Sequence, residues 1–264
     1  MKAPIYQIDA FAGRLFGGNP AAVVVLDAWL PDDTLQSIAA ENNLAETSFV
    51  IPRTDVSPLR WFTPTVEMDL CGHATLAAGH VLFTYHYLTL KHLSFSTCSG
   101  TLAVSRVGDL LSLDFPARPG KAVEVSDALT LALGAKPREV FMSRDLLAVF
   151  DTEAQILALR PRFELIAALD AFAVIVSAPG SDADFVSRFF APRAGIPEDP
   201  VTGSAHCTLV PYWAERLGKQ KLTAKQLSAR RGELVCELQG DRVAIAGRAV
   251  EYLRGEIILP DEAS

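Results

Sequence analysis

The sequence predicts an α+β protein of two similar, pseudo-symmetric domains, each with mostly antiparallel strands curled around one central helix. Short strand patterns dominate the chain. The segment Arg60–Pro64 is echoed 128 residues later by Arg188–Pro192, and each copy runs into an apolar segment led by glycine, Gly72 or Gly203. Chance similarity is the alternative, but the landmarks keep their order and spacing. A duplicated strand–loop–helix unit therefore indicates two related domains.

In the first half, a helix is expected to begin at Asp32 or Asp33, because acidic residues favour the first turn. A second helix, from about 72 to 88, is apolar almost all round, and a helix without a polar face is buried. Strands are therefore expected to surround it. The predicted strands are short, β-branched or alternating: Ile5–Phe11, Ala22–Leu26, Thr47–Ile51, Leu59–Phe62, Leu93–Thr97, Leu102–Arg106 and Leu110–Phe115.

Ala117–Gly120 contains Pro and Gly together and is the predicted linker. The first domain is expected to span 1–118, and the second 119–264, with the C-terminal strand a candidate to rejoin the first. Helices are predicted near Asp127–Leu133 and over about 203–218. The strands predicted here are Glu139–Met142, Leu146–Phe150, Ala173–Ser177, Asp184–Phe190, Leu227–Arg230, Leu234–Leu238, Arg242–Ala246 and Glu256–Leu259.

Composition narrows the function classes. The 264 residues are 50% hydrophobic and 21% charged, as in ordinary globular proteins. A net charge of −7 without long charged runs argues against a nucleic-acid surface. No apolar run reaches the ~18 residues that span a bilayer, so no membrane partner is expected. Four cysteines without a C-x-x-C pair predict no disulfide framework, and a cytoplasmic location is expected.

The two glycine-led helix starts are candidate anion sites. Glycine lets a ligand approach the exposed backbone N–H groups of the first turn, where the helix dipole favours a carboxylate or enolate. Each glycine alone is more simply explained by tight helix–sheet packing. The symmetric pair, Gly72 and Gly203, favours a binding role.

Three side chains are candidates for acid–base chemistry. His73 lies in the first turn of the buried helix, where the dipole is expected to lower its pKa, although a satisfied core histidine is the simpler interpretation. Glu46 precedes a strand, and a desolvated carboxylate there could serve as both base and acid. Asp199 lies in the stiff loop Pro197–Ser204 and could orient an amino group or His73, or cap the helix. No metal site is predicted, because the histidines and cysteines lack zinc spacing.

Four motifs carry a family resemblance: Phe16–Val23 (FGGNPAAV), Asn43–Thr47 (NLAET), Phe62–Pro64 with Cys71–Thr75 (FTP, CGHAT), and Glu198–His206 (EDPVTGSAH). Together they resemble the phenazine-biosynthesis isomerase family, PhzF-like. The motifs are long, in the family's order, and cover nearly the whole chain. The family shares the diaminopimelate epimerase fold, with two similar α/β domains and the site between them.

The resemblance implies that Glu46 is the general acid/base, that His73 and Asp199 support it, and that Gly72, Gly203 and Ser204 hold substrate. It implies an isomerase without cofactor or metal that moves a proton within a small carboxylate-bearing substrate. The type reaction of the family shifts a double bond within a dihydro-hydroxyanthranilate. A homodimer is expected on the same ground.

One departure limits the alternatives. Epimerases of this fold use two opposed cysteines, one before each central helix, but here Cys71 is matched by Thr202. A two-thiol racemase is therefore not supported, and Cys71 is expected to be a small core residue. An amino-acid epimerase using Glu46 with Cys71 or Asp199 stays open, as does a non-catalytic binding protein.

A Cys–His hydrolase, pairing Cys71 or Cys207 with His73 or His206, is a weaker hypothesis. Neighbouring residues on one helix do not generally point at each other. No oxyanion-hole motif is recognisable in the sequence.

Overall fold

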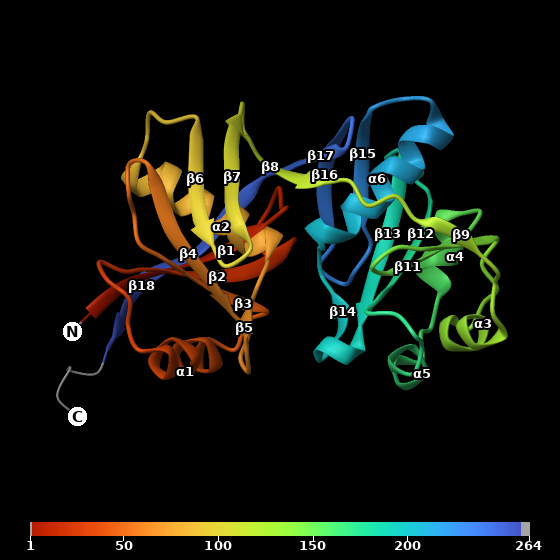
Figure 1. The fold of residues 1–264 in the computed structure, drawn as a ribbon, viewed down its shortest axis with the longest axis horizontal. Coiled ribbons are helices and arrows are strands. Elements are labelled where there is room, and N and C mark those ends of the chain that lie inside the picture. The colour runs from red at the N-terminus through yellow and green to blue at the C-terminus, as the bar shows by residue number, and fades with distance from the viewer. Residues whose placement is uncertain (1, 260–264) are drawn as a thin grey trace. The chain divides into compact units, whose positions relative to one another are not determined.

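The fold separates into two units that repeat one plan, each a curled sheet around a central helix (Figure 1). The computed structural model describes residues 2–259. The first unit takes the described residues up to Asp114 and those from Ala246 onward, and the second is Phe115–Ile245. The predicted fold class is confirmed.

The first unit contains nine strands and two α-helices within the described residues. In chain order its elements are β1 (Lys2–Ala10), β2 (Asn19–Val25), α1 (Asp32–Asn42), β3 (Glu46–Val50), β4 (Val56–Phe62), β5 (Glu67–Met68), α2 (Gly72–Val81), the π-helical turn η1 (Leu82–His86), β6 (His92–Thr97), β7 (Gly100–Val107), β8 (Leu110–Pro116) and β18 (Ala249–Ile258).

The second unit adds three short outer helices to the same plan. Its elements are β9 (Lys121–Val123), α3 (Asp127–Leu133), β10 (Glu139–Met142), β11 (Leu146–Val149), α4 (Glu153–Ala158), α5 (Phe163–Ala167), β12 (Val174–Pro179), β13 (Phe185–Ala191), the 3₁₀ turn η2 (Pro192–Ala194), β14 (Ile196–Asp199), α6 (Gly203–Leu217), β15 (Lys221–Gln226), β16 (Gly232–Gln239) and β17 (Arg242–Gly247).

Strand pairing shows the duplication directly. In the first unit the pairs β18–β1 and β1–β2 are antiparallel, β2–β3 parallel, β3–β4 antiparallel, β4–β6 parallel and β6–β7 antiparallel. In the second unit β9–β10 and β10–β11 are antiparallel, β11–β12 parallel, β12–β13 antiparallel, β13–β15 parallel and β15–β16 antiparallel. Each of these six pairings in one unit has its counterpart, in the same direction, in the other.

The echoed motif makes the same contacts in both units. Arg60 on β4 pairs through Nε and Nη2 with both carboxylate oxygens of Glu67 and lies over the ring of Phe62. Arg188 on β13 pairs in the same way with Glu198, and it lies over the ring of Phe190. Two bidentate ion pairs therefore hold β5 and β14, the short strands that lead into the central helices.

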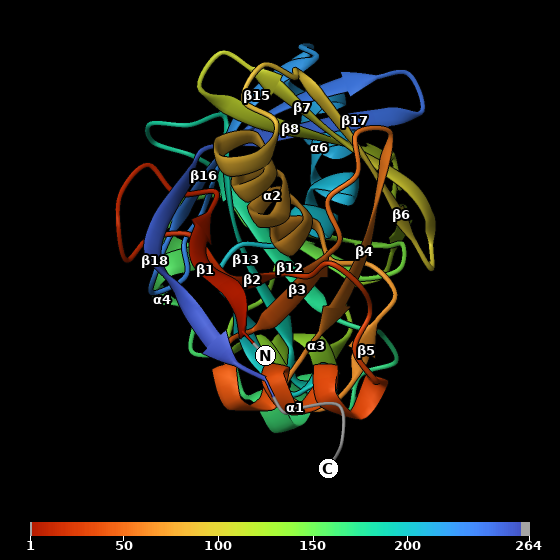
Figure 2. The ribbon, with the colours of Figure 1, turned by 90° about the vertical axis from the view of Figure 1, so that its left-hand side faces the viewer.

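Helix α2 is enclosed by the strands of its unit (Figure 2). Eight of its ten residues are buried, as a helix without a polar face predicts. Gly79 allows close contact with β7, because a Cβ there would lie 2.9 Å from Val104 Cγ1. The regular helix is shorter than predicted, because it ends at Val81 and continues only as the turn η1.

Helix α6 contains a proline, Pro211, and continues through it. Pro211 has no N–H, so the carbonyl of Cys207, four residues earlier, lacks its helical donor. The backbone N–H of Arg118 donates to that carbonyl at 2.8 Å. The segment predicted as a linker therefore supplies the hydrogen bond that α6 lacks.

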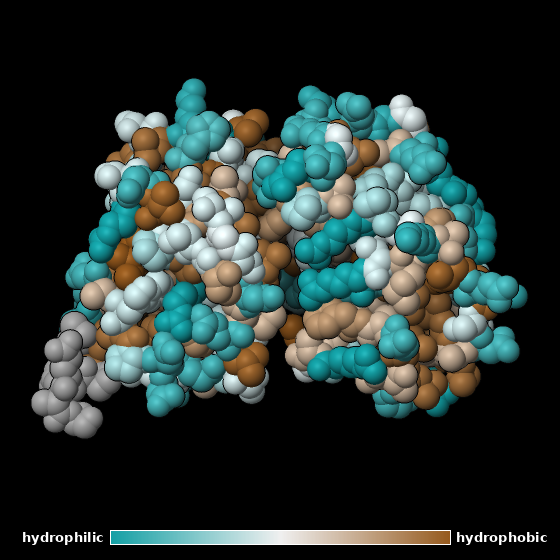
Figure 3. Space-filling view, in the orientation of Figure 1, coloured by the Kyte–Doolittle hydropathy of each residue, from teal (hydrophilic) through white to brown (hydrophobic). Residues whose placement is uncertain are grey.

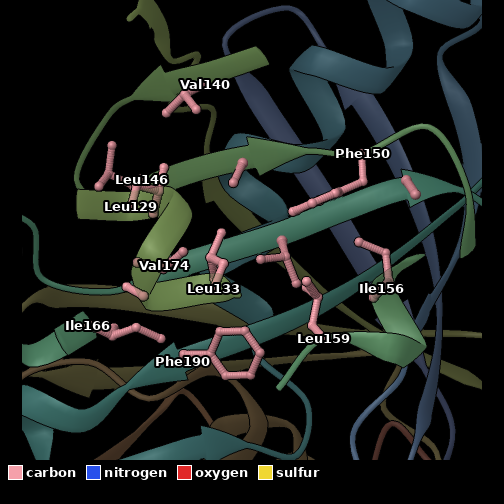
Figure 4. Packing of buried hydrophobic residues seen from close by; sticks show 14 of the residues in the cluster. Leu129, Leu133, Val140, Leu146, Phe150, Ile156, Leu159, Ile166, Val174 and Phe190 are labelled. Atoms are coloured by element: carbon pink, nitrogen blue, oxygen red, sulfur yellow. The ribbon is translucent and has the colours of Figure 1, made fainter. Parts of the chain in front are cut away.

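Outer helices close the other face of each sheet. In the second unit α3, α4 and α5 bury Leu133, Ile156 and Ile166 against strand residues such as Val174 and Phe190 (Figure 4). In the first unit α1 buries its apolar face against β3 and β4. Polar and apolar side chains are interspersed on the visible face of each unit (Figure 3).

Some predicted elements were wrong or missing. The strand predicted at Leu227–Arg230 is a turn, in which Arg231 has φ +58° and donates its N–H to Ser228 Oγ. The strand in this region is β15, which ends at Gln226, just before the turn. The sequence patterns also missed β5, β9, β14, α4 and α5, which are all short. Within the described residues, no helix is long and apolar enough to cross a membrane.

Candidate active site

A buried polar cluster lies where β2 and β3 begin and α2 starts. The two strands are parallel neighbours, so their first residues share one edge of the sheet. Asn19 opens β2, Glu46 opens β3, and His73 is the second residue of α2. The Ser48 hydroxyl of β3 donates to the carbonyl of Ala74 at 3.0 Å, which fixes the first helical turn against the strand.

Glu46 and His73 are in contact inside this cluster. Glu46 Oε2 lies 3.0 Å from His73 Nε2, and the two side chains are 8% and 7% exposed. The contact lies outside hydrogen-bond geometry, and neither atom makes a hydrogen bond to any described residue. Two buried polar atoms in this state are costly unless something else bonds to them. Both atoms therefore retain capacity for a further hydrogen bond.

The other nitrogen of the His73 ring has two neighbours. Cys71 Sγ lies 3.5 Å and Asn19 Nδ2 lies 3.3 Å from His73 Nδ1. The expectation that Cys71 and His73 would not face each other was wrong. The two side chains can meet because Cys71 precedes the helix and has an extended backbone (φ −141°, ψ 109°). The spacing of side chains on a helix therefore does not apply to this pair.

The predicted pKa direction of His73 was also wrong. Burial by itself lowers this pKa, but the neighbouring Cys71 and Glu46 groups favour the imidazolium and hold the pKa well above its ordinary value. Burial, followed by the charge of Glu46, raises the pKa of the Cys71 thiol. The sequence-based expectation considered only the helix dipole and left out Cys71 and Glu46, which lie beside the ring.

The same three side chains bring together a carboxylate, a thiol and an imidazole, which are donor types that zinc uses. Cys71 and Glu46 approach different nitrogens of the ring, however. One ligand atom from each of the three side chains nevertheless lies within 4.8 Å of the other two. The cluster therefore contains the groups needed for acid–base chemistry as well as the donor types of a metal site.

In the second unit Asp199 is held by a separate polar network. Asp199 ends β14 and is 8% exposed, and the Thr202 hydroxyl donates to its Oδ2. Gln226 of β15 accepts from the Thr202 N–H at 2.8 Å and donates to the Asp199 carbonyl at 2.8 Å and to Thr202 Oγ1 at 3.1 Å. This network fixes the loop that leads into α6.

The predicted binding residues lie at the two helix starts. Gly72 is the first residue of α2, and Gly203 and Ser204 are the first two of α6. Neither helix has a side-chain cap. The first N–H groups of a helix have no intrahelical acceptor, so uncapped ends such as these can bind anions.

His206, one turn into α6, is fully buried. Its Nδ1 lies 2.9 Å from the Thr202 carbonyl, while Nε2 makes no hydrogen bond to the described residues. Burial lowers the pKa of His206 to about 4. This histidine is therefore neutral over the physiological range.

Sequence reasoning missed Asn19 and Gln226. Both are fully buried and form the hydrogen bonds described above. Asn19 carried a detectable signal, since it is a polar residue at the head of the apolar strand β2. It follows Gly18, which has φ +63°. A Cβ at this position would lie 2.2 Å from the Ala10 carbonyl oxygen, so only glycine fits there. Gln226 carried no such signal.

Comparisons with known proteins identify the family. The model of the family described as "Phenazine biosynthesis-like protein" (PhzC-PhzF) matches residues 8–255. An uncharacterized isomerase of Pseudomonas aeruginosa is 52% identical, with 98% of this chain and 100% of that protein covered. Phenazine biosynthesis-like domain-containing protein 2 of Mus musculus is 41% identical, with 97% and 99% covered.

A solved structure gives the same result. The crystal structure of a PhzF-family phenazine biosynthesis protein from Enterococcus faecalis is 46% identical to the chain. It superposes with a TM-score of 0.96, with 98% of this chain and 100% of that chain covered. The chain therefore belongs to the phenazine biosynthesis-like (PhzC-PhzF) family, whose relatives include proteins named as isomerases.

Proposed function

We propose that the protein is an isomerase that moves a proton within a small carboxylate-bearing substrate, with Glu46 as the general acid and base. The observation that carries this proposal is the buried contact between Glu46 Oε2 and His73 Nε2, two atoms with unused bonding capacity. A general base is a positioned side chain that can reach the proton it removes. Glu46 is buried, and it lies beside His73, whose protonation responds to its charge.

The proposed reaction has two proton transfers. Glu46 takes a proton from an acidified C–H of the substrate, and the electron pair moves into the adjacent π system. The same carboxyl group then returns the proton to a carbon further along that system, on the same face. No net oxidation occurs, and neither step needs an external proton donor.

His73 and the helix start have supporting roles in this proposal. His73, whose pKa is held high by its neighbours, supplies positive charge beside the carboxylate. The uncapped N-terminus of α2, at Gly72, favours the substrate carboxylate or the negative charge that develops on it. We assign Asp199, Gly203 and Ser204 to substrate binding as a prediction, to be tested by substitution.

The substrate class is a cyclic amino- or hydroxy-substituted carboxylic acid. The test is a panel of dihydro-aromatic amino and hydroxy acids followed by NMR for double-bond migration. Glu46→Gln is expected to lower the rate at least about 10³-fold, because the amide cannot exchange the proton. Glu41→Gln, at an exposed position of α1, is the matched control and should retain activity.

An amino-acid epimerase is the second candidate, with Cys71 as the partner acid. The proximity of its sulfur to the Glu46–His73 pair favours testing it. A chiral assay on free amino acids separates the two functions. Tight binding of a panel member with no proton exchange under any condition would instead support a binding protein.

A further inference from the structure

The Nδ1 atom of His73 faces two side chains that can each donate or accept a hydrogen bond. The amide nitrogen Nδ2 of Asn19 lies 3.3 Å away and the Cys71 sulfur 3.5 Å away. An amide has a donor end and an acceptor end, while a thiol is a weak donor and a weak acceptor. Nδ1 therefore has a partner whether or not it carries a proton.

This property matters because the ring is buried. His73 is 5% exposed, Cys71 6% and Asn19 0%. When Nδ1 is bare, an N–H of Asn19 or the S–H of Cys71 can donate to it. When Nδ1 is protonated, the sulfur can accept, or the amide oxygen once the Asn19 amide has turned over. With apolar neighbours instead, one of the two states would leave a buried polar atom unsatisfied.

We infer that Cys71 and Asn19 are positioning residues, which hold His73 by Nδ1 in both protonation states and so keep Nε2 facing Glu46. Neither residue needs to touch the reacting atoms. The role of this positioning in catalysis rests on the proposed function. The contacts of Cys71 and Asn19 with the His73 ring are a property of the fold alone. A ring fixed at Nδ1 gives Glu46 the same neighbour before and after it takes up a proton.

The repeated unit supports this assignment. Cys71 immediately precedes Gly72, and Thr202 immediately precedes Gly203. In the second unit Thr202 donates its hydroxyl proton to Asp199, another predicted site residue. The residue before each central helix therefore contacts a candidate site residue of its own unit. A role as a passive core residue does not explain this repetition.

The electrostatic surroundings of His73 are simple enough to test. Two titratable groups act on the ring, Cys71 ahead of the helix and Glu46 on β3. Asn19 on β2 brings a dipole without a charge. The direction in which each substitution at Cys71 or Asn19 changes the proton affinity of His73 can therefore be predicted from the hydrogen-bonding groups that it removes or adds.

The experiment is ¹⁵N NMR of the full chain, which reports the tautomer and the titration of each histidine ring. The His73 signals are assigned by their loss in His73→Gln. Cys71→Ala removes an acceptor for the Nδ1 proton, so the proton affinity of His73 should fall about tenfold. Cys71→Ser keeps a donor and acceptor and should stay near wild type.

Asn19→Asp provides an independent variant with the opposite sign. A carboxylate can only accept from Nδ1, so the proton affinity of His73 should rise about tenfold. Cys98→Ala, at an exposed cysteine, is the matched control and should leave the His73 signals unchanged. Far-UV circular dichroism checks that each variant is folded.

Unchanged His73 titration and tautomer in folded Cys71→Ala and Asn19→Asp would overturn the inference. If Cys71→Ala does not fold, Asn19→Asp still decides it. These measurements need no substrate. A failure here leaves Glu46 as the candidate base, whereas loss of the isomerase proposal would leave the NMR result standing.

Discussion

Glu46 and His73 come from different elements, the first residue of β3 and the second residue of α2, and their Oε2 and Nε2 atoms lie 3.0 Å apart. The parallel pairing of β2 with β3 and the hydrogen bond from Ser48 to Ala74 set this distance. The contact depends on the backbone of the first unit and requires no residue of the second. Predictions about it can therefore be tested on the folded chain without a substrate.

The raised pKa of His73 predicts a loss of stability at alkaline pH. The folded pKa exceeds the unfolded value of about 6.5, so the stabilisation is complete below about pH 6.5 and is lost as the pH rises through the folded pKa. Urea unfolding between pH 6.5 and 8.5 should show this decline in wild type. His73→Gln should flatten it, and an unchanged slope would contradict the assignment.

His206 predicts the opposite dependence. Its folded pKa is about 4 and its unfolded pKa about 6.5, so its contribution is complete above pH 6.5 and is lost as the pH falls towards 4. The loss between pH 7 and pH 4 should be about 3 kcal/mol. His206→Asn, which keeps a donor for the Thr202 carbonyl, should remove that slope, whereas His92→Asn at an exposed site should not.

Gln226 is predicted to be a major stabilising residue of the second unit. Gln226→Ala removes three buried hydrogen bonds and leaves the Thr202 N–H and the Asp199 carbonyl without this partner. The cost should be about 3 kcal/mol in urea unfolding. Gln239→Ala, at the exposed end of β16, should stay within about 0.5 kcal/mol of wild type. Equal effects of the two substitutions would show that the network carries little energy.

Gly79 tests the packing of α2. Replacing a helix glycine with alanine usually stabilises by about 1 kcal/mol. Here the new methyl would lie 2.9 Å from Val104 Cγ1, so Gly79→Ala should instead destabilise by about 1–2 kcal/mol. In a double-mutant cycle, Val104→Ala should relieve part of this cost. Additive costs would mean that helix and strand do not touch as described.

Sequence patterns predicted the parts of the fold that are encoded locally. The all-apolar composition of Gly72–Val81 predicted a buried central helix, and the echo of Arg60–Pro64 in Arg188–Pro192 predicted the duplication. Short elements such as α4 and α5 span fewer than two turns, which is too little for a clear periodicity. In β15, the sparse apolar residues Leu222 and Ala224 gave a weak strand signal.

The candidate site was only partly accessible from sequence. Glu46 and His73 stood out through their motifs. The pKa direction of His73 depends on the groups of Cys71 and Glu46, and no local rule places Glu46 beside the ring. Gln226 lies 24 residues from Thr202, and only the pairing of β15 with β13 brings it to that loop.

The central claim is tested most directly by deuterium uptake. Once a substrate is found in the panel, the reaction is run in D₂O and the product is examined by NMR for deuterium at the carbon that receives the proton. Wild type and Glu41→Gln should label that carbon, and Glu46→Gln should not. Labelling by folded Glu46→Gln at the wild-type rate would contradict the assignment of Glu46 as the acid and base.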